Sequence, residues 1–233
     1  MNKPVAVVVG VGPGNGAALA RRFHAAGYAV ALLARSPALI TELGRELEGA
    51  RPYTCDVGDE ASVAQVFSAI ATEMGPVEAL IYNAGGGVWG TIEEVTPQAF
   101  EQSWRVNALG ALLASKQVVS QMKQAGRGSV VFIGATASRR GNVKTAAFAP
   151  AKAAQRSLAE SMARHLWPAG VHVAVLVIDG VVDLPRTRQM MPGKPDTFFV
   201  APEDVAEAAL QLTRQPRSTW TFELEVRPFG EAW

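Results

Sequence analysis

A glycine-rich turn near the start of the chain has residue types and spacing that suit phosphate binding. The turn Gly10-Val11-Gly12-Pro13-Gly14-Asn15-Gly16 follows the apolar run Val5–Val9 and precedes an alanine-rich segment. At a strand-to-helix turn, glycine lets backbone amides approach a pyrophosphate at the positive end of the helix. The motif starts at either Gly12 or Gly10, and we favour Gly10 because the predicted strand ends there. Close helix packing explains the same glycines, so the turn alone does not decide the matter.

The end of the second predicted strand bears on the kind of dinucleotide. An NAD site would place an Asp or Glu there for the ribose hydroxyls, whereas this chain has Ala34-Arg35-Ser36. A guanidinium suits the 2'-phosphate of NADP, and one charge-assisted contact is worth about 1.5 to 3 kcal/mol, or roughly a 10-fold to 100-fold preference. We therefore predict NADP(H) in preference to NAD(H), with Arg35 and Ser36 at the phosphate. The alternative is that Arg35 is only a solvated surface charge.

Apolar β-branched runs alternate with helical segments along the chain, as a parallel sheet with crossover helices requires. We expect strands at Val5–Val9, Tyr28–Ala34, Tyr53–Cys55, Val77–Tyr82, Ser129–Ile133, Val171–Ile178 and Phe222–Val226. We expect helices at Ala17–Ala26, 37–49, 59–75, 96–124, Phe148–Trp167 and from Pro202 onward. This order predicts a single α/β domain over residues 1–233, Rossmann-like and doubly wound, with about seven parallel strands and helices on both faces.

Further polar residues follow these elements at ordered spacings. Asp56-Val57 follows the third strand, Asn83-Ala84-Gly85 follows the fourth, Asn107 lies in the long helix, and Lys152 lies four residues after Phe148. With these motifs the chain resembles the short-chain dehydrogenases/reductases over nearly its whole length. The resemblance implies that Asp56-Val57 holds the adenine and that Asn83-Ala84-Gly85 stabilises the sheet and the cofactor loop. It also implies that Asn107 shapes a proton-relay water site and that Lys152 holds the nicotinamide ribose.

The two hydroxyls that members of this family usually use for catalysis are missing. The family carries a Ser after the fifth strand and, thirteen residues later, a Tyr that begins the pattern Y-x-x-x-K. This chain has Ala135 and Phe148 at the matching positions, while Lys152 is retained. Loss of a positioned general acid commonly lowers a rate by about 10² to 10⁴. Asn107 and Lys152 are therefore the remaining candidates for the catalytic machinery.

A proton donor would have to come from another group. The candidates are Thr136, Ser138, Thr145, Asp179 and Lys152 acting through a water at Asn107. Thr136 is one position out of register with Ala135, and a loop-capping role is favoured for it. Asp179-Gly180 stands where the resemblance implies a Pro-Gly near the nicotinamide, so Gly180 is expected at the cofactor, although Asp179 also suits an Asx-type turn. Leu184 is a third departure, because relatives often have a carboxamide-binding threonine there.

The segment 179–200 is expected to be a loop that acts as a substrate lid. Apolar pairs in it and near the Asn83 loop suggest a pocket for an apolar small molecule, with ordinary packing as an equally good explanation. These pairs are Val88-Trp89, Met190-Met191 and Phe198-Phe199. The basic residues Arg186, Arg188 and Lys194 complicate this interpretation.

Composition limits the partners. The formal net charge is +1, which gives no basic surplus for nucleic-acid binding. No apolar run is long enough for a signal peptide or a membrane span, and the single Cys55 fits a reducing compartment, so we expect a cytoplasmic protein without a membrane partner. His24, His165 and His172 lack metal-ligand spacing, so no metal is expected. The resemblance implies a homodimer or homotetramer.

Two hypotheses of different classes remain open. In the first, the chain is an NADP(H)-dependent oxidoreductase with an altered proton route, acting on a small, apolar molecule. In the second, it is a cofactor-binding sensor or scaffold that turns nothing over. The cofactor motifs fit both equally, and the retained Asn107 and Lys152 favour the enzyme modestly.

Overall fold

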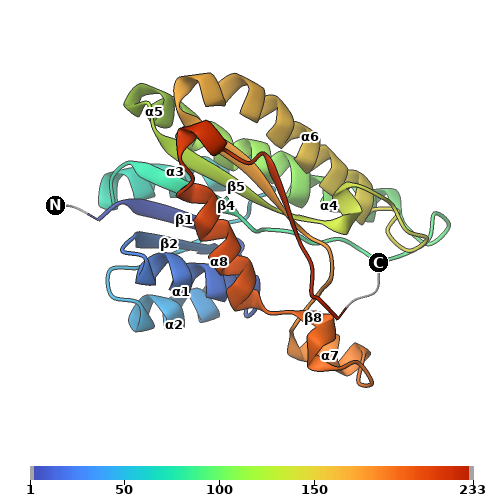
Figure 1. Cartoon of the computed structure of the whole chain (residues 1–233). Helices are drawn as coiled ribbons and strands as arrows, with labels where there is room; N and C mark the ends of the chain where they lie inside the picture. Colours follow the sequence, from blue (N-terminus) through green and yellow to red (C-terminus); the bar gives the residue numbers. More distant parts are fainter. Residues whose placement is uncertain (1–2, 231–233) are drawn as a thin grey trace.

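Seven parallel strands form the central sheet of the computed structural model, which describes residues 3–230 (Figure 1). The strands are β1 (Val5–Val9), β2 (Ala29–Ala34), β3 (Arg51–Thr54), β4 (Val77–Tyr82), β5 (Gly128–Ala135), β6 (Val171–Ile178) and β9 (Glu223–Val226). Their order is β3-β2-β1-β4-β5-β6-β9, and each neighbouring pair is parallel. This order confirms the predicted Rossmann-like fold. Residues 1–2 and 231–233 of the predicted domain lie outside the described part.

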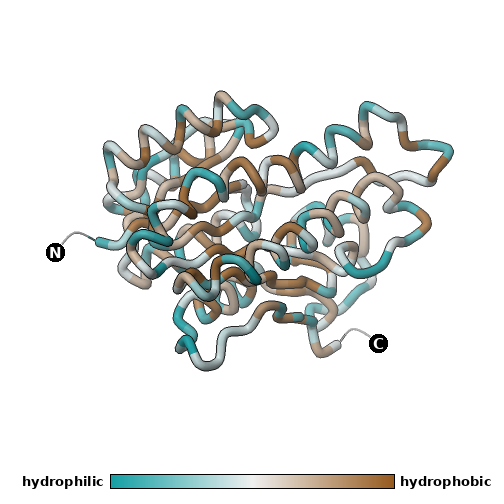
Figure 2. The backbone as a smooth tube through the Cα atoms, turned by 90° about the horizontal axis from the view of Figure 1, so that it is seen from above, coloured by the Kyte–Doolittle hydropathy of each residue, from teal (hydrophilic) through white to brown (hydrophobic). Residues whose placement is uncertain are grey.

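Helices cover both faces of the sheet, as predicted. α1 (Asn15–Ala25), α2 (Pro37–Glu46) and α8 (Pro202–Thr213) pack on one face, whereas α3 (Glu60–Glu73), α5 (Gly110–Ala125) and α6 (Phe148–Leu166) pack on the other. β1 and β6 are buried along their whole length, which explains why their sequences are almost continuously apolar. Seen from above, many of the most hydrophobic residues, coloured brown, lie in the middle of the molecule (Figure 2).

The long helix expected over residues 96–124 is wrong in one respect, because a π-helical turn divides it. α4 (Pro97–Trp104) leads into the turn Arg105–Leu109, and α5 continues from Gly110. The Tyr82 hydroxyl donates to the Val106 carbonyl at 2.6 Å, and the Asn107 side chain donates to the Ser103 carbonyl at 2.8 Å. These side chains compensate locally for the altered helical hydrogen bonding that a π turn brings. Asn107 lies within this turn, and its side chain also donates to the Gly86 carbonyl of the loop after β4 at 2.6 Å.

The segment 179–200 has more regular structure than the expected loop. It contains β7 (Val181–Val182), α7 (Pro185–Met190), a 3-10 turn (Asp196–Phe198) and β8 (Phe199–Val200), and β7 pairs with β8 in parallel. The Thr187 hydroxyl accepts from the Leu184 amide at 3.0 Å, which caps α7. Figure 1 shows α7 and β8 projecting beside the main sheet.

Two of the three basic residues of this segment, Arg188 and Lys194, contact neighbouring side chains, whereas Arg186 is exposed. Arg188 forms ion pairs with Asp183 at 2.7 Å and with Asp196 at 2.6 Å. Its guanidinium also lies 4.2 Å from the centroid of the Phe199 ring. Lys194 lies over the Phe198 ring at 4.4 Å. These contacts link residues within the segment, and the ion pairs engage the charge of Arg188.

Candidate functional site

A cavity of about 630 Å³, here called the glycine cleft, lies at the carboxyl ends of β1, β2 and β4. It sits where the strand order reverses between β1 and β4, which is the usual ligand position in open α/β sheets. The predicted site residues that line it are Gly10, Gly14, Asn15, Gly16, Arg35, Ser36, Val57, Asn83, Ala84 and Gly85. The structure therefore brings together most of the residues that the sequence analysis assigned to a dinucleotide.

Close contacts explain two of the glycines. Gly10 has φ +88°, and a Cβ there would collide with the Ala84 backbone. A Cβ on Gly16 would lie 2.5 Å from the Gly10 carbonyl oxygen. The Asn83 side-chain amide donates to that same carbonyl at 2.7 Å, which ties the end of β4 to the turn. Glycine and asparagine thus fix the backbone that faces the cleft.

Arg35 is the sole charged side chain among the described residues that line the glycine cleft. It is exposed at the end of β2, next to Ser36, and no acidic residue lines the cleft in the described part of the chain. The charge of the residues that line the glycine cleft therefore favours a ligand with negative charge near Arg35.

Two buried acceptors lack a hydrogen-bond partner among the described residues. They are Oδ1 of Asn15, which lines the glycine cleft, and Oδ1 of Asn107, which approaches Gly85. Buried polar atoms are nearly always satisfied by the protein, by water or by a ligand. A hydroxyl or amide donor of a dinucleotide in the cleft would suit Oδ1 of Asn15, so the residues that line the cleft fit such a cofactor.

Lys152 is buried at the start of α6, close to the glycine cleft. Its Nζ donates to the Ile133 carbonyl at 2.9 Å and to Oε1 of Gln155 at 3.0 Å. Burial without a charged partner lowers the pKa of the Lys152 amine to about 8. The sequence analysis missed Gln155, although a position three residues after Lys152 on a helix lies on the same face.

Asp56, expected at the adenine, lies next to residues of the glycine cleft. Its Oδ1 accepts from the Gly58 amide at 2.9 Å in an Asx-type turn, and Asp56 does not line the glycine cleft. Its neighbours Cys55 and Val57 do line the cleft. Burial raises the pKa of the Cys55 thiol, which keeps it in its neutral form.

A second cavity of about 460 Å³, here called the Phe148 pocket, adjoins the glycine cleft through β7. Val181 lines the pocket and Val182 lines the cleft. Ala135, Phe148 and Trp89 form an apolar wall of the pocket, and Phe148 stacks on Trp89 with 5.8 Å between the ring centroids. Gly180 lines this pocket rather than the glycine cleft. The apolar pairs Met190-Met191 and Phe198-Phe199 do not line this pocket.

Thr136 and Asp179 supply polar groups to the Phe148 pocket. The Thr136 hydroxyl donates to the buried Asp179 carboxylate, and Arg227 forms an ion pair with the same carboxylate. The Arg140 guanidinium, which also lines the pocket, lies 3.7 Å from the Asp179 carboxylate. Arg227 lies just beyond β9, far along the chain from Asp179, and no sequence pattern predicts this pairing.

The other candidate hydroxyls donate to backbone carbonyls, although Thr145 also lines the Phe148 pocket. Ser138 donates to the Ala135 carbonyl at 2.7 Å, and Thr145 donates to the Asn142 carbonyl at 3.0 Å. Leu184 does not approach the Phe148 pocket. It lines the glycine cleft, and its side chain packs so closely on Gly14 that a Cβ there would collide with it.

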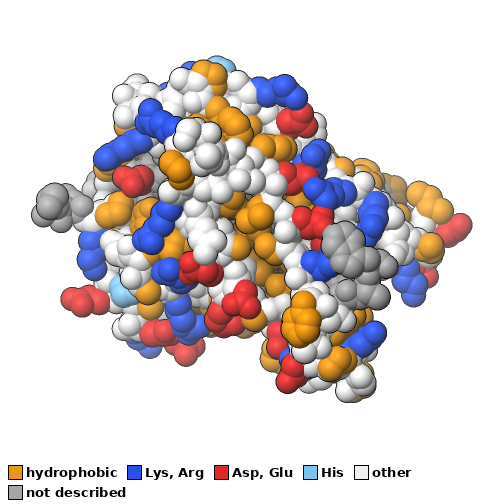
Figure 3. Space-filling model, viewed as in Figure 1, with side chains coloured by type: hydrophobic (Ala, Val, Ile, Leu, Met, Phe, Trp, Pro, Cys, Tyr) orange, Lys and Arg blue, Asp and Glu red, His pale blue; other side chains and the backbone are white. Residues whose placement is uncertain are grey.

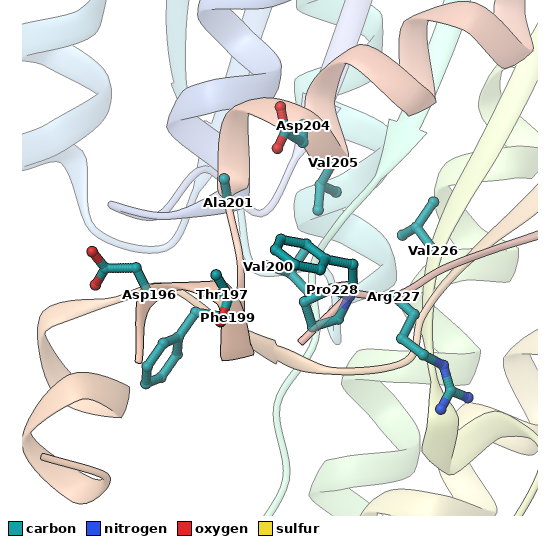
Figure 4. Close-up of a pocket in the computed structure, with 11 residues that line it drawn as sticks. Asp196, Thr197, Phe199, Val200, Ala201, Asp204, Val205, Val226, Arg227 and Pro228 are labelled. Atoms are coloured by element: carbon teal, nitrogen blue, oxygen red, sulfur yellow. The ribbon is translucent and has the colours of Figure 1, made fainter. Parts of the chain in front are cut away.

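A further cavity of about 530 Å³ lies between α8, β8 and the segment after β9 (Figure 4). Asp196 and Asp204 stand at different sides of it, and the Arg227 guanidinium points away from both. No residue predicted as a site residue lines this cavity. The glycine cleft and the Phe148 pocket therefore form the candidate site.

Two other site classes have no support within residues 3–230. No group of three or more potential metal-ligating side chains comes together there. Within the same range, no helix is both long and apolar enough to cross a membrane.

Comparisons with known proteins agree with this geometry. The inactive 2-(S)-hydroxypropyl-CoM dehydrogenase 2 of Xanthobacter autotrophicus is 31% identical over 208 residues, covering 83% of this chain and 90% of that protein. A solved short-chain dehydrogenase from Rhodopseudomonas palustris is 34% identical with a TM-score of 0.83, covering 97% of this chain and 99% of its own. An alcohol dehydrogenase from the archaeon Thermococcus sibiricus, complexed with 5-hydroxy-NADP, is 27% identical with a TM-score of 0.88, covering 98% of each chain.

A family model provides the broadest match. The model described as short chain dehydrogenase matches residues 4–192, which include the glycine turn, Asn107, Phe148 and Lys152. The predicted resemblance is thereby confirmed, and the chain belongs to the short-chain dehydrogenase family of oxidoreductases.

Proposed function

We propose that this protein is an NADP(H)-dependent oxidoreductase that acts on a small, largely apolar molecule. The observation that carries the proposal is the glycine cleft, in which Arg35 is the sole charged lining side chain among the described residues. A 2'-phosphate would bring negative charge to this guanidinium, whereas an NAD site would need an acidic residue for the ribose hydroxyls. The 5-hydroxy-NADP bound to the similar archaeal alcohol dehydrogenase supports the same choice.

The residues of the cleft would divide the work of holding the cofactor. Backbone amides of the turn between Gly10 and Gly16 would face the pyrophosphate at the start of α1. Arg35 and Ser36 would bind the 2'-phosphate, and Lys152 would reach the ribose side of the nicotinamide. When bound, the cofactor supplies or accepts a hydride.

Proton handling is the unusual part of the proposed site. Ala135 and Phe148 offer no exchangeable proton, while Thr136 and Asp179 line the same pocket as a hydrogen-bonded pair. We infer that a substrate hydroxyl would donate to Thr136 as the Thr136 proton moves to Asp179, and that the reverse order would deliver a proton to a carbonyl oxygen. Arg227 forms an ion pair with Asp179 and holds this carboxylate beside the Thr136 hydroxyl.

The pocket also limits the substrate class. Its volume suits a small molecule, and its wall of Trp89, Phe148, Ile178 and Val181 is apolar. A compact ketone or secondary alcohol with an apolar body fits this lining. Highly charged substrates fit the pocket poorly. Its two charged lining residues, Asp179 and Arg140, have opposite charges and form an ion pair with each other.

Turnover is tested by following NADPH absorbance over a panel of carbonyl compounds and activated alkenes. We expect slow oxidation of NADPH by apolar ketones. The double variant Ala135→Ser with Phe148→Tyr should raise the rate by about 10-fold or more, because it restores a positioned acid. A folded double variant that binds NADPH and stays inactive would contradict the proposed superposition of sites.

The second candidate function is an NADP(H)-binding sensor or scaffold without turnover. It is favoured by the Phe148 ring, which stacks on Trp89 where a proton donor is expected, and by the relative that is named an inactive dehydrogenase. NADPH binding, seen as fluorescence quenching, with no turnover across the whole panel would select this alternative.

A further inference from the structure

Gln155 is a buried polar side chain of α6 that has both ends of its amide engaged. It is 1% exposed. Its Oε1 accepts from Lys152 Nζ at 3.0 Å, and its Nε2 donates to the Asn107 carbonyl at 2.9 Å. One amide therefore connects the buried amine of α6 to the π turn.

Asn107 is held firmly at the other end of this connection. Its side-chain nitrogen donates to the Gly86 carbonyl at 2.6 Å and to the Ser103 carbonyl at 2.8 Å. Its Oδ1 is buried and has no partner among the described residues. The donor from Gln155 satisfies the backbone carbonyl, so this oxygen of the side chain is the remaining free acceptor of Asn107.

The engaged amide also limits where Lys152 can act. An ammonium group has three N–H donors, and those of Lys152 reach Ile133 and Gln155, which leaves one. A Cβ built on Gly85 would lie 3.4 Å from Nζ and 3.3 Å from Oδ1 of Asn107. The amine and the free acceptor thus approach the same short stretch of the cofactor loop.

We propose that Gln155 is the positioning residue of Lys152, which it fixes to the Asn107 carbonyl so that the free N–H is directed toward Gly85. The carboxamide has no titratable proton, so it does not pass a proton from the amine to the π turn. Lys152 thereby acts on a ligand at Gly85 and does not start a proton path along the Asn107 carbonyl. The proposal concerns the chain itself and rests on the proposed function only for its binding readout.

No charged group among the described residues is known to contact the Lys152 amine, so its titration should respond mainly to changes at its hydrogen-bond partners. The groups that approach it are uncharged: the Ile133 carbonyl from β5, the Gln155 amide from α6, the Gly85 backbone after β4 and the Asn107 amide of the π turn. A change of charge or of hydrogen bonding at Gln155 should therefore appear directly in the ionisation of Lys152.

The experiment follows Lys152 by NMR of lysine labelled with 13C at Cε, in the protein without cofactor, with Lys152→Met used to assign the signal. The variants are Gln155→Glu, which keeps an acceptor for the amine, and Gln155→Met, which removes both hydrogen bonds at similar size. The control is Gln117→Glu, which adds the same charge at an exposed position of α5. We expect Gln155→Glu to raise the titration midpoint by about one pH unit or more, Gln155→Met to lower it, and the control to leave it unchanged.

A binding measurement completes the test. NADPH affinity at neutral pH should fall about 5-fold to 10-fold in Gln155→Met, since the amine loses an orienting contact. The same titration midpoint in wild type and Gln155→Glu would overturn the proposal, whether or not Gln155→Met folds. Normal titration shifts with no NADPH binding in any form would leave Gln155 as the positioning residue and reject the proposed cofactor.

Discussion

At the scale of single residues, the site differs from the usual family pattern in its proton donors. Ala135 and Phe148 replace the usual Ser and Tyr, and other residues of the pocket carry the remaining hydroxyls. Ala135 and Phe148 stand in the pocket as apolar groups, and the Thr136 hydroxyl, which is bonded to Asp179, lines the same pocket. The sequence indicated Thr136 and Asp179 only as weak candidates. Their pairing was not predictable because it depends on the end of β6 meeting the turn that follows β5.

Thr136→Val tests this pair, since valine keeps the shape and removes the hydroxyl. If Thr136 transfers the proton, kcat should fall by about 10² or more while NADPH affinity stays the same. Thr72→Val is the matched control, because the Thr72 hydroxyl bonds only to the Ser68 carbonyl on the exposed side of α3. An unchanged kcat in a folded Thr136→Val variant would exclude Thr136 from the reaction.

Lys152 provides a second prediction, which concerns stability and pH. Its folded pKa of about 8 lies below the ordinary value of 10.5, so the unfolded chain binds more protons between these two values. The penalty for burying the charged amine is therefore full below pH 8 and disappears as the pH rises to 10.5. The free energy of unfolding of wild type should gain up to about 3 kcal/mol on that of Lys152→Met over this interval.

Denaturant unfolding of both proteins at a series of pH values between 7 and 10.5 measures this gain. Taking the difference between the two proteins removes the contribution of other titrating groups. A difference that stays constant over the interval would show that the amine titrates at its ordinary pKa.

At the scale of elements, most of the architecture could be predicted from the sequence and the local irregularities could not. The apolar runs of β1, β4 and β6 and the glycine and proline boundaries indicated the strands and crossovers correctly. The π turn was missed because an apolar helical pattern runs through residues 96–124 without a break. The hydrogen bond to its Val106 carbonyl comes from Tyr82, which lies on β4 and is distant in the sequence. The helix α7 was missed because its six residues are too few for a periodic pattern.

The register of β5 shows the same limit. The strand was expected at Ser129–Ile133, but it runs from Gly128 to Ala135 because all eight of its residues pair with β6. Pairing with a long neighbouring strand is a tertiary effect that the local sequence does not record. It places Ala135 at the end of the strand, facing the pocket, and Thr136 at the start of the following turn.

Gly110 is the first residue of α5 after the π turn and packs closely on Tyr82 of β4, which gives a prediction at this scale. A Cβ on Gly110 would collide with the Tyr82 hydroxyl and lie 2.8 Å from the Val57 carbonyl. Gly110→Ala should therefore lower the free energy of unfolding by about 1 to 3 kcal/mol, despite the better helix propensity of alanine. Chemical denaturation measures it, with Gly193→Ala as control because nothing lies within 4 Å of a Cβ there. An equal effect in both variants would contradict the close contact.

At the scale of the whole molecule, charge and apolar surface have different distributions. On the face shown in Figure 3, basic and acidic side chains are interspersed around a central strip of apolar side chains. Exposed large apolar residues also occur on the outer surface of the helices α4 and α5, namely Phe100, Trp104 and Leu112. An apolar surface of this kind suits contact with another protein surface.

We expect the surface of α4 and α5 to form the contact between copies of this chain, in a homodimer or homotetramer. Leu112→Glu should then shift the molar mass measured by light scattering toward that of one chain, because a buried charge destabilises an apolar contact. Met190→Glu, which places the same charge on the exposed helix α7, should leave the assembly unchanged. A wild type that is monomeric at micromolar concentration would reject this expectation.

The central claim is that the glycine cleft binds NADP(H) through Arg35. The most direct test is calorimetric titration of wild type and Arg35→Asp with NADPH and with NADH at one fixed ionic strength. We predict that wild type binds NADPH roughly 10-fold to 100-fold more tightly than NADH, and that Arg35→Asp removes or reverses this preference. Equal affinities of wild type for the two dinucleotides, or a preference that persists in Arg35→Asp, would contradict the claim.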